Sequence, residues 1–140
     1  MRVVADTNTV ISGSLWSSAP RQVLGAARSG KISLFTSVVL LIELEDVLQR
    51  PKFSQCLALV GATAHELVLG YAAIATVVEP ALISPVVTAD PDDDAVLACA
   101  LAARAEIIVS GDNHLLDLKQ YQDIEILTAA SLIELITLKT

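Results

Sequence analysis

The sequence predicts an α/β fold with three layers, in which helices cover both faces of a mainly parallel central sheet. Short apolar segments alternate with helical patterns along the chain, an order that produces parallel strands joined by right-handed crossovers. One segment, Ile107-Ile108-Val109, is apolar and β-branched throughout. A strand of that kind belongs in a sheet that is buried on both faces. With 140 residues, 54% of them hydrophobic, the chain is expected to form a single domain, residues 1–140, with a full core.

Caps and breakers place the elements of the first half. Pro20 suits the first turn of a helix and Gly30 its end. Ser37 can cap the next helix, which must stop before Pro51. We therefore expect strands at residues 2–5 and 31–36, helices at 20–28, 38–49 and 53–60, and a loop or frayed helix at 12–18.

Two capping-box spacings organise the second half. Thr63 with Glu66 opens one helix, and Ser131 with Glu134 opens the last one. A central Ala/Leu helix follows the acidic residues 90–94 and leads to the apolar strand. The expected elements are helices at 63–75, 95–105, 115–118 and from 131, strands at 77–79, 107–109 and 125–127, and a loop at 81–89 in which 86–88 can be extended.

Composition limits the class of protein. No apolar stretch approaches ~20 residues without a charge, and the first residues lack the apolar core of a secretory signal, so we expect a cytoplasmic protein without a membrane span. Cys56 and Cys99 are interpreted as buried thiols rather than a disulfide or a metal pair. Cys99 and Trp16 are both assigned to packing. The net charge of −7 argues against nucleic acid binding unless cations neutralise part of it.

Acidic residues from distant parts of the sequence are directed to one edge of the predicted sheet. Asp6 follows the first strand, Asp112 follows the strand at 107–109, and Asp94 starts the helix before that strand. Ligands bind in open parallel sheets outside the carboxyl ends of the strands, where the strand order reverses. Topology alone therefore predicts that these three carboxylates lie near one another.

A fourth acid comes from the helix at 38–49. At helical spacing Glu43 lies beside Val39, Leu40 and Val47, whereas Asp46 lies beside polar residues and Glu45 is intermediate. A carboxylate among apolar side chains is costly unless it is paired, and a cation is a suitable partner. We therefore select Glu43 from the three acids of this helix.

Carboxylates in this arrangement favour hard divalent cations. Mg²⁺ and Mn²⁺ prefer oxygen ligands, and one or two such ions can activate a water and stabilise the leaving oxygen of a phosphodiester. Neither of the two histidines, His65 and His114, fits a hydrolase triad. The predicted chemistry is metal-assisted hydrolysis that needs no histidine.

Taken together, these segments resemble the PIN-domain ribonucleases, notably the VapC-like toxins of bacterial toxin–antitoxin pairs. Residues 1–8 are similar to the family's first strand, 42–53 to its helical Glu segment, 90–103 to its third acidic position, and 109–113 with Leu115 and Leu116 to its fourth. The resemblance covers essentially the whole chain. It implies a PIN-like fold, an Mg²⁺- or Mn²⁺-dependent ribonuclease, an RNA substrate, a homodimer and a cognate antitoxin.

The resemblance also implies roles for individual residues. Carried over by position, the metal-binding and catalytic carboxylates are Asp6, Glu43, Asp94 and Asp112, and the supporting residues are Asn8 and Ser110. Asp93 competes with Asp94 for the third position, and Asp94 is preferred because the apolar helix pattern begins directly after it. The basic residues available to hold phosphates are Arg21, Arg28, Arg50, Lys52, Arg104 and Lys119.

Simpler roles exist for each acid. Asp6 and Asp112 suit turns and helix caps, the acids at 90–94 suit a helix N-terminus, and Glu43 can be an ordinary helix glutamate. Alternative functions are a PIN-like module that binds RNA or protein without cutting, an Asp-nucleophile phosphatase, and a phospho-receiver domain. The phosphatase would need a second acid where Asn8 stands, and the receiver would need a phosphoacceptor Asp after the third strand, where residues 77–80 supply none.

Overall fold

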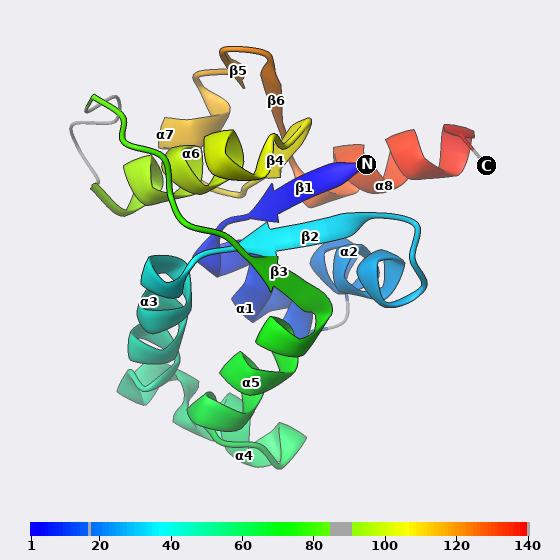
Figure 1. The fold of residues 1–140 in the computed structure, drawn as a ribbon. Coiled ribbons are helices and arrows are strands. Elements are labelled where there is room, and N and C mark those ends of the chain that lie inside the picture. The colour runs from blue at the N-terminus through cyan, green and yellow to red at the C-terminus, as the bar shows by residue number, and fades with distance from the viewer. Residues whose placement is uncertain (17, 85–90, 140) are drawn as a thin grey trace.

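The computed structural model describes residues 1–16, 18–84 and 91–139 (Figure 1). The strands are β1 (Arg2–Ala5), β2 (Ser33–Thr36), β3 (Ala75–Val77), β4 (Ile107–Val109), β5 (Gln120–Tyr121) and β6 (Ile124–Leu127). The helices are α1 (Thr7–Leu15), α2 (Ala19–Arg28), α3 (Val38–Leu48), α4 (Ser54–Val60), α5 (Ala64–Ile74), α6 (Pro91–Ala103), α7 (Asn113–Leu116) and α8 (Ala129–Lys139), with a 3₁₀ turn at Pro51–Phe53.

The strands form one sheet in the order β3-β2-β1-β4-β6-β5. All neighbouring pairs are parallel except β5 with β6, which is antiparallel. From β1 the chain builds outward to β2 and β3, then returns to place β4 on the other side of β1. The strand order therefore reverses between β1 and β4, and the predicted α/β fold with a mainly parallel sheet is confirmed.

Alternate residues of the central strands enter two separate cores. Val3 and Ala5 of β1 pack with α1, α2, α3, α5 and α8 on one face, while Val4 packs with α6 and α7 on the other. Ile108 of β4 lies on the α6 side, and its neighbours in the strand lie on the opposite side. Figure 1 shows these helix layers above and below the sheet. Burial on both faces explains why Val3–Ala5 of β1 and all of β4 are apolar.

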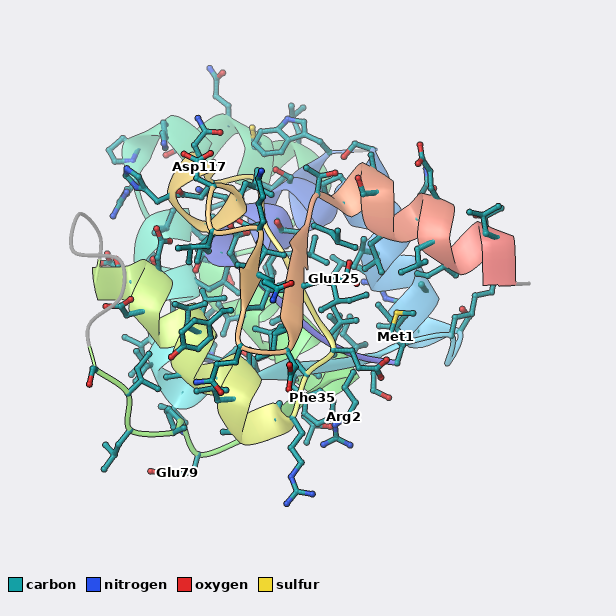
Figure 2. The ribbon with its side chains drawn as sticks, turned by 90° about the horizontal axis from the view of Figure 1, so that it is seen from above. Met1, Arg2, Phe35, Glu79, Asp117 and Glu125 are labelled. Carbon is teal, nitrogen blue, oxygen red and sulfur yellow. The ribbon has the colours of Figure 1, made fainter. Side chains whose placement is uncertain are left out.

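The two ends of the sheet differ in chemistry. At the amino end, the Arg2 guanidinium lies 4.4 Å from the centroid of the Phe35 ring, and its Nε donates to the carbonyl of Ala103 at 2.6 Å. This contact ties the last turn of α6 to β1. Figure 2 places Arg2 beside Phe35, with Asp117, just beyond α7, far across the sheet. The carboxyl end is where the acidic residues gather.

Helix α6 packs closely on the sheet through small side chains. Cys99, Ala100 and Ala103 are fully buried together with Leu97. Burial raises the pKa of the Cys99 thiol to about 12, so this thiol stays protonated and inert. Both cysteines are free, as predicted, although Cys56 is only half-buried.

Several element boundaries confirm the sequence signals. Pro20 lies in the first turn of α2, and Gly30 adopts a left-handed φ of +81° just beyond its end. The Ser37 hydroxyl caps α3 by accepting from the amide of Leu40. Thr63 and Glu66 form the predicted capping box at α5.

Other boundaries differ from the predictions. The segment expected to be a loop or frayed helix belongs largely to α1, which the Asp6 side chain caps. Gly13 lets α1 approach α2 closely, because a Cβ there would lie 2.8 Å from both the Pro20 carbonyl oxygen and Leu24 Cδ1. Strand β3 begins at Ala75 rather than at residue 77, directly after α5.

The last third of the chain holds two further differences. Strand β5 was not predicted, since two residues are too short to show a pattern. Helix α8 begins at Ala129, where the Thr128 hydroxyl accepts from the amide of Ser131 at 3.2 Å. The capping role expected of Ser131 therefore belongs to Thr128. The extended segment expected at 86–88 lies outside the described residues.

Among the described residues, no single helix combines the length and the apolar character needed to cross a bilayer. The helical segments Pro51–Val60 and Ala64–Ile74 pass on length and composition only as a pair, and their axes are bent by 70°.

Candidate metal centre

A polar cavity of about 300 Å³ opens at the carboxyl ends of β1 and β4, where the strand order reverses. This is the position at which open parallel sheets bind ligands. The residues that line this cavity, called the acidic cavity below, are Asp6, Thr7, Asn8, Glu43, Val47, Arg50, Lys52, Asp92, Asp93, Val96 and Asp112. Three of the four carboxylates selected from the sequence are among them.

Asp6 is held rigidly at the edge of the sheet. Its Oδ1 accepts from the Thr9 amide at 2.9 Å, and its Oδ2 accepts from the Ser110 hydroxyl at 2.6 Å. The backbone amide of Asp6 also donates to the carbonyl of Val109 at 3.0 Å. Asp6 does cap α1, as its simpler role requires, but it is also 4% exposed and lines the cavity. Capping fixes the carboxylate in place without excluding a second function.

Ser110 connects the ends of β1 and β4. Its hydroxyl donates to Asp6 and accepts from the amide of Asp112 at 2.9 Å. Asp112 then caps the short helix α7 through Oδ1, which accepts from the His114 amide at 2.7 Å. Asp6, Ser110 and Asp112, called the β1–β4 corner below, thus form one hydrogen-bonded unit. These bonds place Ser110 between two of the carboxylates selected from the sequence.

The three acids of α3 have different surroundings. Glu43 lines the cavity, and its Oε2 accepts from the Thr7 hydroxyl at 2.8 Å. Glu45 pairs instead with His65 at 2.6 Å, and Asp46 forms an exposed pair with Arg50 at 3.8 Å. The selection of Glu43 over its neighbours agrees with this placement.

The acids at the start of α6 are separated by the rotation of the helix. The helix begins at Pro91, so Asp92, Asp93 and Asp94 all lie in its first turn. Successive residues of an α-helix point about 100° apart. Asp93 is 6% exposed and lines the cavity, and Asp92 lines it from a more exposed position. Asp94, which was preferred from the sequence, does not line the cavity, whereas its competitor Asp93 does.

Asp93, Asp112 and His114 form the group best placed to hold a metal ion. One ligand atom from each lies within 4.8 Å of the others. His114 Nδ1 is 3.6 Å from Asp112 Oδ1 and 3.9 Å from Asp93 Oδ2. Two carboxylates and an imidazole are a donor set that suits Mn²⁺ and other first-row divalent ions. The residues present therefore fit a divalent cation.

His114 is the site residue that sequence reasoning missed. It follows Asp112 by two residues, and the α7 turn that Asp112 caps returns its ring toward both carboxylates. The only signal in the sequence was its closeness to a selected acid. A search for triads could not detect it, because its partners are two carboxylates.

Two basic residues complete the cavity. Arg50 and Lys52 line it at the end of α3 and in the 3₁₀ turn. Asn8 is exposed in the first turn of α1 and lines the same space. The cavity thus has an acidic wall from four elements and a basic rim from one segment. A cation bound at the acidic residues and a phosphate bound at Arg50 and Lys52 would both be electrostatically complementary to the cavity.

Residues 2–114 match the family model of the PIN domain. The chain belongs to the PIN-domain family. The match runs from β1 to α7 and so includes every acid of the cavity. No curated protein matches the chain significantly.

PIN domains are typically nucleases, and the acidic cavity has the residue types that such an activity needs. The six-stranded, mostly parallel sheet with helices on both faces agrees with that family. Neither the phosphatase nor the receiver alternative gains support from this PIN domain. Its second position after β1 carries Asn8 rather than an acid, and β3 ends at Val77 with no Asp beside it.

Proposed function

We propose that this PIN domain is a metal-dependent endoribonuclease that hydrolyses phosphodiester bonds of RNA. The observation that carries the proposal is the convergence of Asp6, Glu43, Asp93 and Asp112, from four separate segments of the chain, on one cavity at the carboxyl edge of the sheet. A purely structural origin would explain caps at Asp6 and Asp112. It would not explain why Glu43 and Asp93 are turned to the same space.

The proposed metal ligands are Asp93 and Asp112 with His114, whose donor atoms lie within 4.8 Å of one another. Asp6 and Glu43 line the same cavity and are available to a second ion or to its bound waters. Asp93 here replaces Asp94, because Asp94 does not line the cavity. Mg²⁺ or Mn²⁺ remains the proposed cofactor, since oxygen donors dominate the set.

The chain's own residues divide the work of hydrolysis. Lys52 and Arg50 face the cavity and can hold phosphates on either side of the cleaved bond. Ser110 keeps Asp6 oriented through its 2.6 Å hydrogen bond, and Thr7 does the same for Glu43. A divalent cation, when bound, supplies the polarisation of the phosphoryl oxygen and an acidified water.

The net charge of −7 is compatible with this proposal because of where the charge lies. Several of the acids line one cavity, so bound cations would cancel a concentrated part of the charge. The basic pair Arg50 and Lys52 lies beside that part. Binding of RNA should therefore depend on divalent metal, in addition to the usual weakening by salt.

The test is cleavage of single-stranded RNA with Mn²⁺, with Mg²⁺ and with EDTA, by the unchanged protein and by Asp6→Asn. Asp123→Asn makes the same chemical change at an exposed position in the β5–β6 turn and serves as the control. We expect cutting only with metal, at least a hundredfold loss in Asp6→Asn, and none in the control. Equal cutting by Asp6→Asn would reject the site. RNA binding without cutting under any metal would favour the non-catalytic alternative.

We also propose that the protein acts as the toxin of a toxin–antitoxin pair and forms a homodimer. Support for an interface comes from exposed apolar side chains on α3, where Val38, Val39 and Ile42 are each more than half exposed. Such side chains are typical of protein contact surfaces. Light scattering of the unchanged protein and of Ile42→Lys would check the dimer. A neighbouring reading frame whose product blocks cleavage would support the antitoxin, and its absence would count against it.

A further inference from the structure

A second hollow adjoins the acidic cavity on the side of α1. It has a volume of about 410 Å³ and is lined by Asn8, Ile11, Ser12, Trp16, Lys52 and Phe53. Asn8 and Lys52 line the acidic cavity as well. The two spaces therefore share a wall, and a polymer held in one can continue into the other. This space is called the Trp16 hollow below.

Trp16 offers an aromatic surface to this hollow. It follows the last residue of α1, where its backbone amide donates to the carbonyl of Ser12 at 2.9 Å. Although sequence analysis assigns it to packing, 45% of the residue is exposed. Its ring lies 6.4 Å from that of Phe53, centroid to centroid, at an angle of 57°. Phe53 is buried, so it supports the indole from the protein side and leaves part of it open.

Lys52 adds a positive charge at the same place. Its Nζ lies 5.1 Å from the centroid of the Phe53 ring, and it faces both spaces. A single exposed tryptophan needs no explanation by itself. An exposed aromatic side chain and a cation that line one hollow, which shares two lining residues with an acidic cavity, are a more specific combination. Single-stranded nucleic acids are bound by aromatic platforms for the bases and cations for the backbone.

We propose that the Trp16 hollow is a base subsite for single-stranded RNA. A base that flanks the scissile phosphate stacks on the indole of Trp16, and Lys52 neutralises the phosphate between the two spaces. The substrate is single-stranded because paired bases in an A-form helix are not free to stack on a side chain. The inference rests on the proposed function in one respect, since it takes the acidic cavity as the seat of the scissile phosphate.

Trp16 is the only tryptophan in the chain, so tryptophan fluorescence, excited selectively over the two tyrosines, reports on this hollow alone. A short single-stranded RNA is titrated into Asp6→Asn in the presence of Mn²⁺, so that the RNA can bind but stays uncut. We expect quenching that saturates. In a series of oligonucleotides that each lack one base, the quenching should disappear for one position next to the cleaved bond. A fully paired duplex should not quench.

Variants give a second measurement. Trp16→Ala should weaken binding of labelled single-stranded RNA about tenfold, as expected for one lost base stack, and Trp16→Phe should keep most of the affinity. Leu59→Ala removes an exposed apolar side chain from α4, outside the hollow, and should change nothing. Thermal unfolding of each variant by circular dichroism separates loss of binding from loss of fold.

The outcomes separate the subsite from the nuclease. Metal-dependent cutting of RNA without any quenching would overturn the subsite and leave the proposed function intact. Base-dependent quenching without cutting under any metal would support the subsite and reject the nuclease. Equal quenching by base-free polyphosphate would overturn the subsite, because charge alone would explain it. Quenching by a protein partner but not by RNA would assign the hollow to that partner and overturn it as well.

Discussion

The β1–β4 corner and the start of α6 both bring acids to the cavity, but by different means. In the corner, Asp6 and Ser110 are 104 residues apart and joined by a buried hydrogen bond, and both follow paired parallel strands. At the start of α6 the acids are consecutive, and the rotation of the helix decides which of them faces the cavity. The corner is fixed by sheet topology, whereas the α6 acids are fixed by helical phase. The consecutive aspartates at the start of α6 are the same residue type, but we expect them to differ strongly in their contribution to function.

The largest expected effect tests that difference directly. Asp93→Asn should reduce metal-dependent RNA cleavage by at least about a hundredfold, because loss of a supporting partner alone typically costs about 10–100-fold. Asp94→Asn is the matched control, since it makes the same change one residue away and outside the cavity. It should remain close to the activity of the unchanged protein. Initial rates with saturating Mn²⁺ measure both. A larger loss of activity in Asp94→Asn than in Asp93→Asn would favour Asp94, as the sequence suggested.

A second pair tests helical phase on α3. Glu43→Gln should lower activity about 10–100-fold, because Glu43 lines the cavity and holds the Thr7 hydroxyl. Asp46→Asn removes only an exposed pair with Arg50, and such pairs contribute little. Rates and Mn²⁺ affinities of both variants, measured side by side, check this. Equal losses would mean that α3 acts through its total charge and not through one residue.

The hydrogen bonds of the β1–β4 corner can be removed by replacing Ser110, the residue that joins Asp6 to Asp112. Ser110→Ala leaves Asp6 Oδ2 and the Asp112 amide without their shared partner, and such groups typically cost about 1–3 kcal/mol when buried. As a positioning residue, Ser110 should also affect metal affinity, by about tenfold. Urea unfolding and Mn²⁺ titration measure the two effects, with Ser33→Ala at an exposed position of β2 as the control. Lost stability with unchanged affinity would assign Ser110 a structural role only.

The same difference explains what the sequence could predict. The positions of Asp6 and Asp112 at the cavity were predictable because both residues follow apolar strands, and parallel topology places such residues at one edge of the sheet. The position of Glu43 at the cavity was predictable because Leu40 and Val47, two of its neighbours at helical spacing, are buried, although the third, Val39, is 53% exposed. Asp94 was preferred over Asp93 because the helix was expected to start after Asp94. With that start, the direction in which each aspartate of the first turn points could not be assigned correctly. Phase depends on where a helix begins, and the structure has this start at Pro91.

Other misses have related physical causes. Two residues able to cap a helix, Thr128 and Ser131, stand three positions apart, and the helix begins at Ala129, so that Thr128 caps it while Ala129 and Leu132 are buried in the core. Strand β5 depends on its pairing with β6 and has no pattern of its own. Trp16 was assigned to packing, and its ring does lie against Phe53, but its position at the end of α1 leaves 45% of the residue exposed. In each case the deciding contact is tertiary.

The smallest expected effect concerns the identity of the metal. His114 offers an imidazole nitrogen beside Asp93 and Asp112, and Mn²⁺ accepts nitrogen ligands more readily than Mg²⁺, which prefers oxygen. His114→Ala should therefore weaken Mn²⁺ binding several-fold and leave Mg²⁺ binding nearly unchanged. Calorimetric titration with each ion gives the ratio, and His65→Ala, the other histidine, whose partner is Glu45 on α3, is the control. If His114→Ala weakened the binding of both ions equally, His114 would act by orienting Asp112 rather than as a metal ligand. The β1–β4 corner would then include His114 as well.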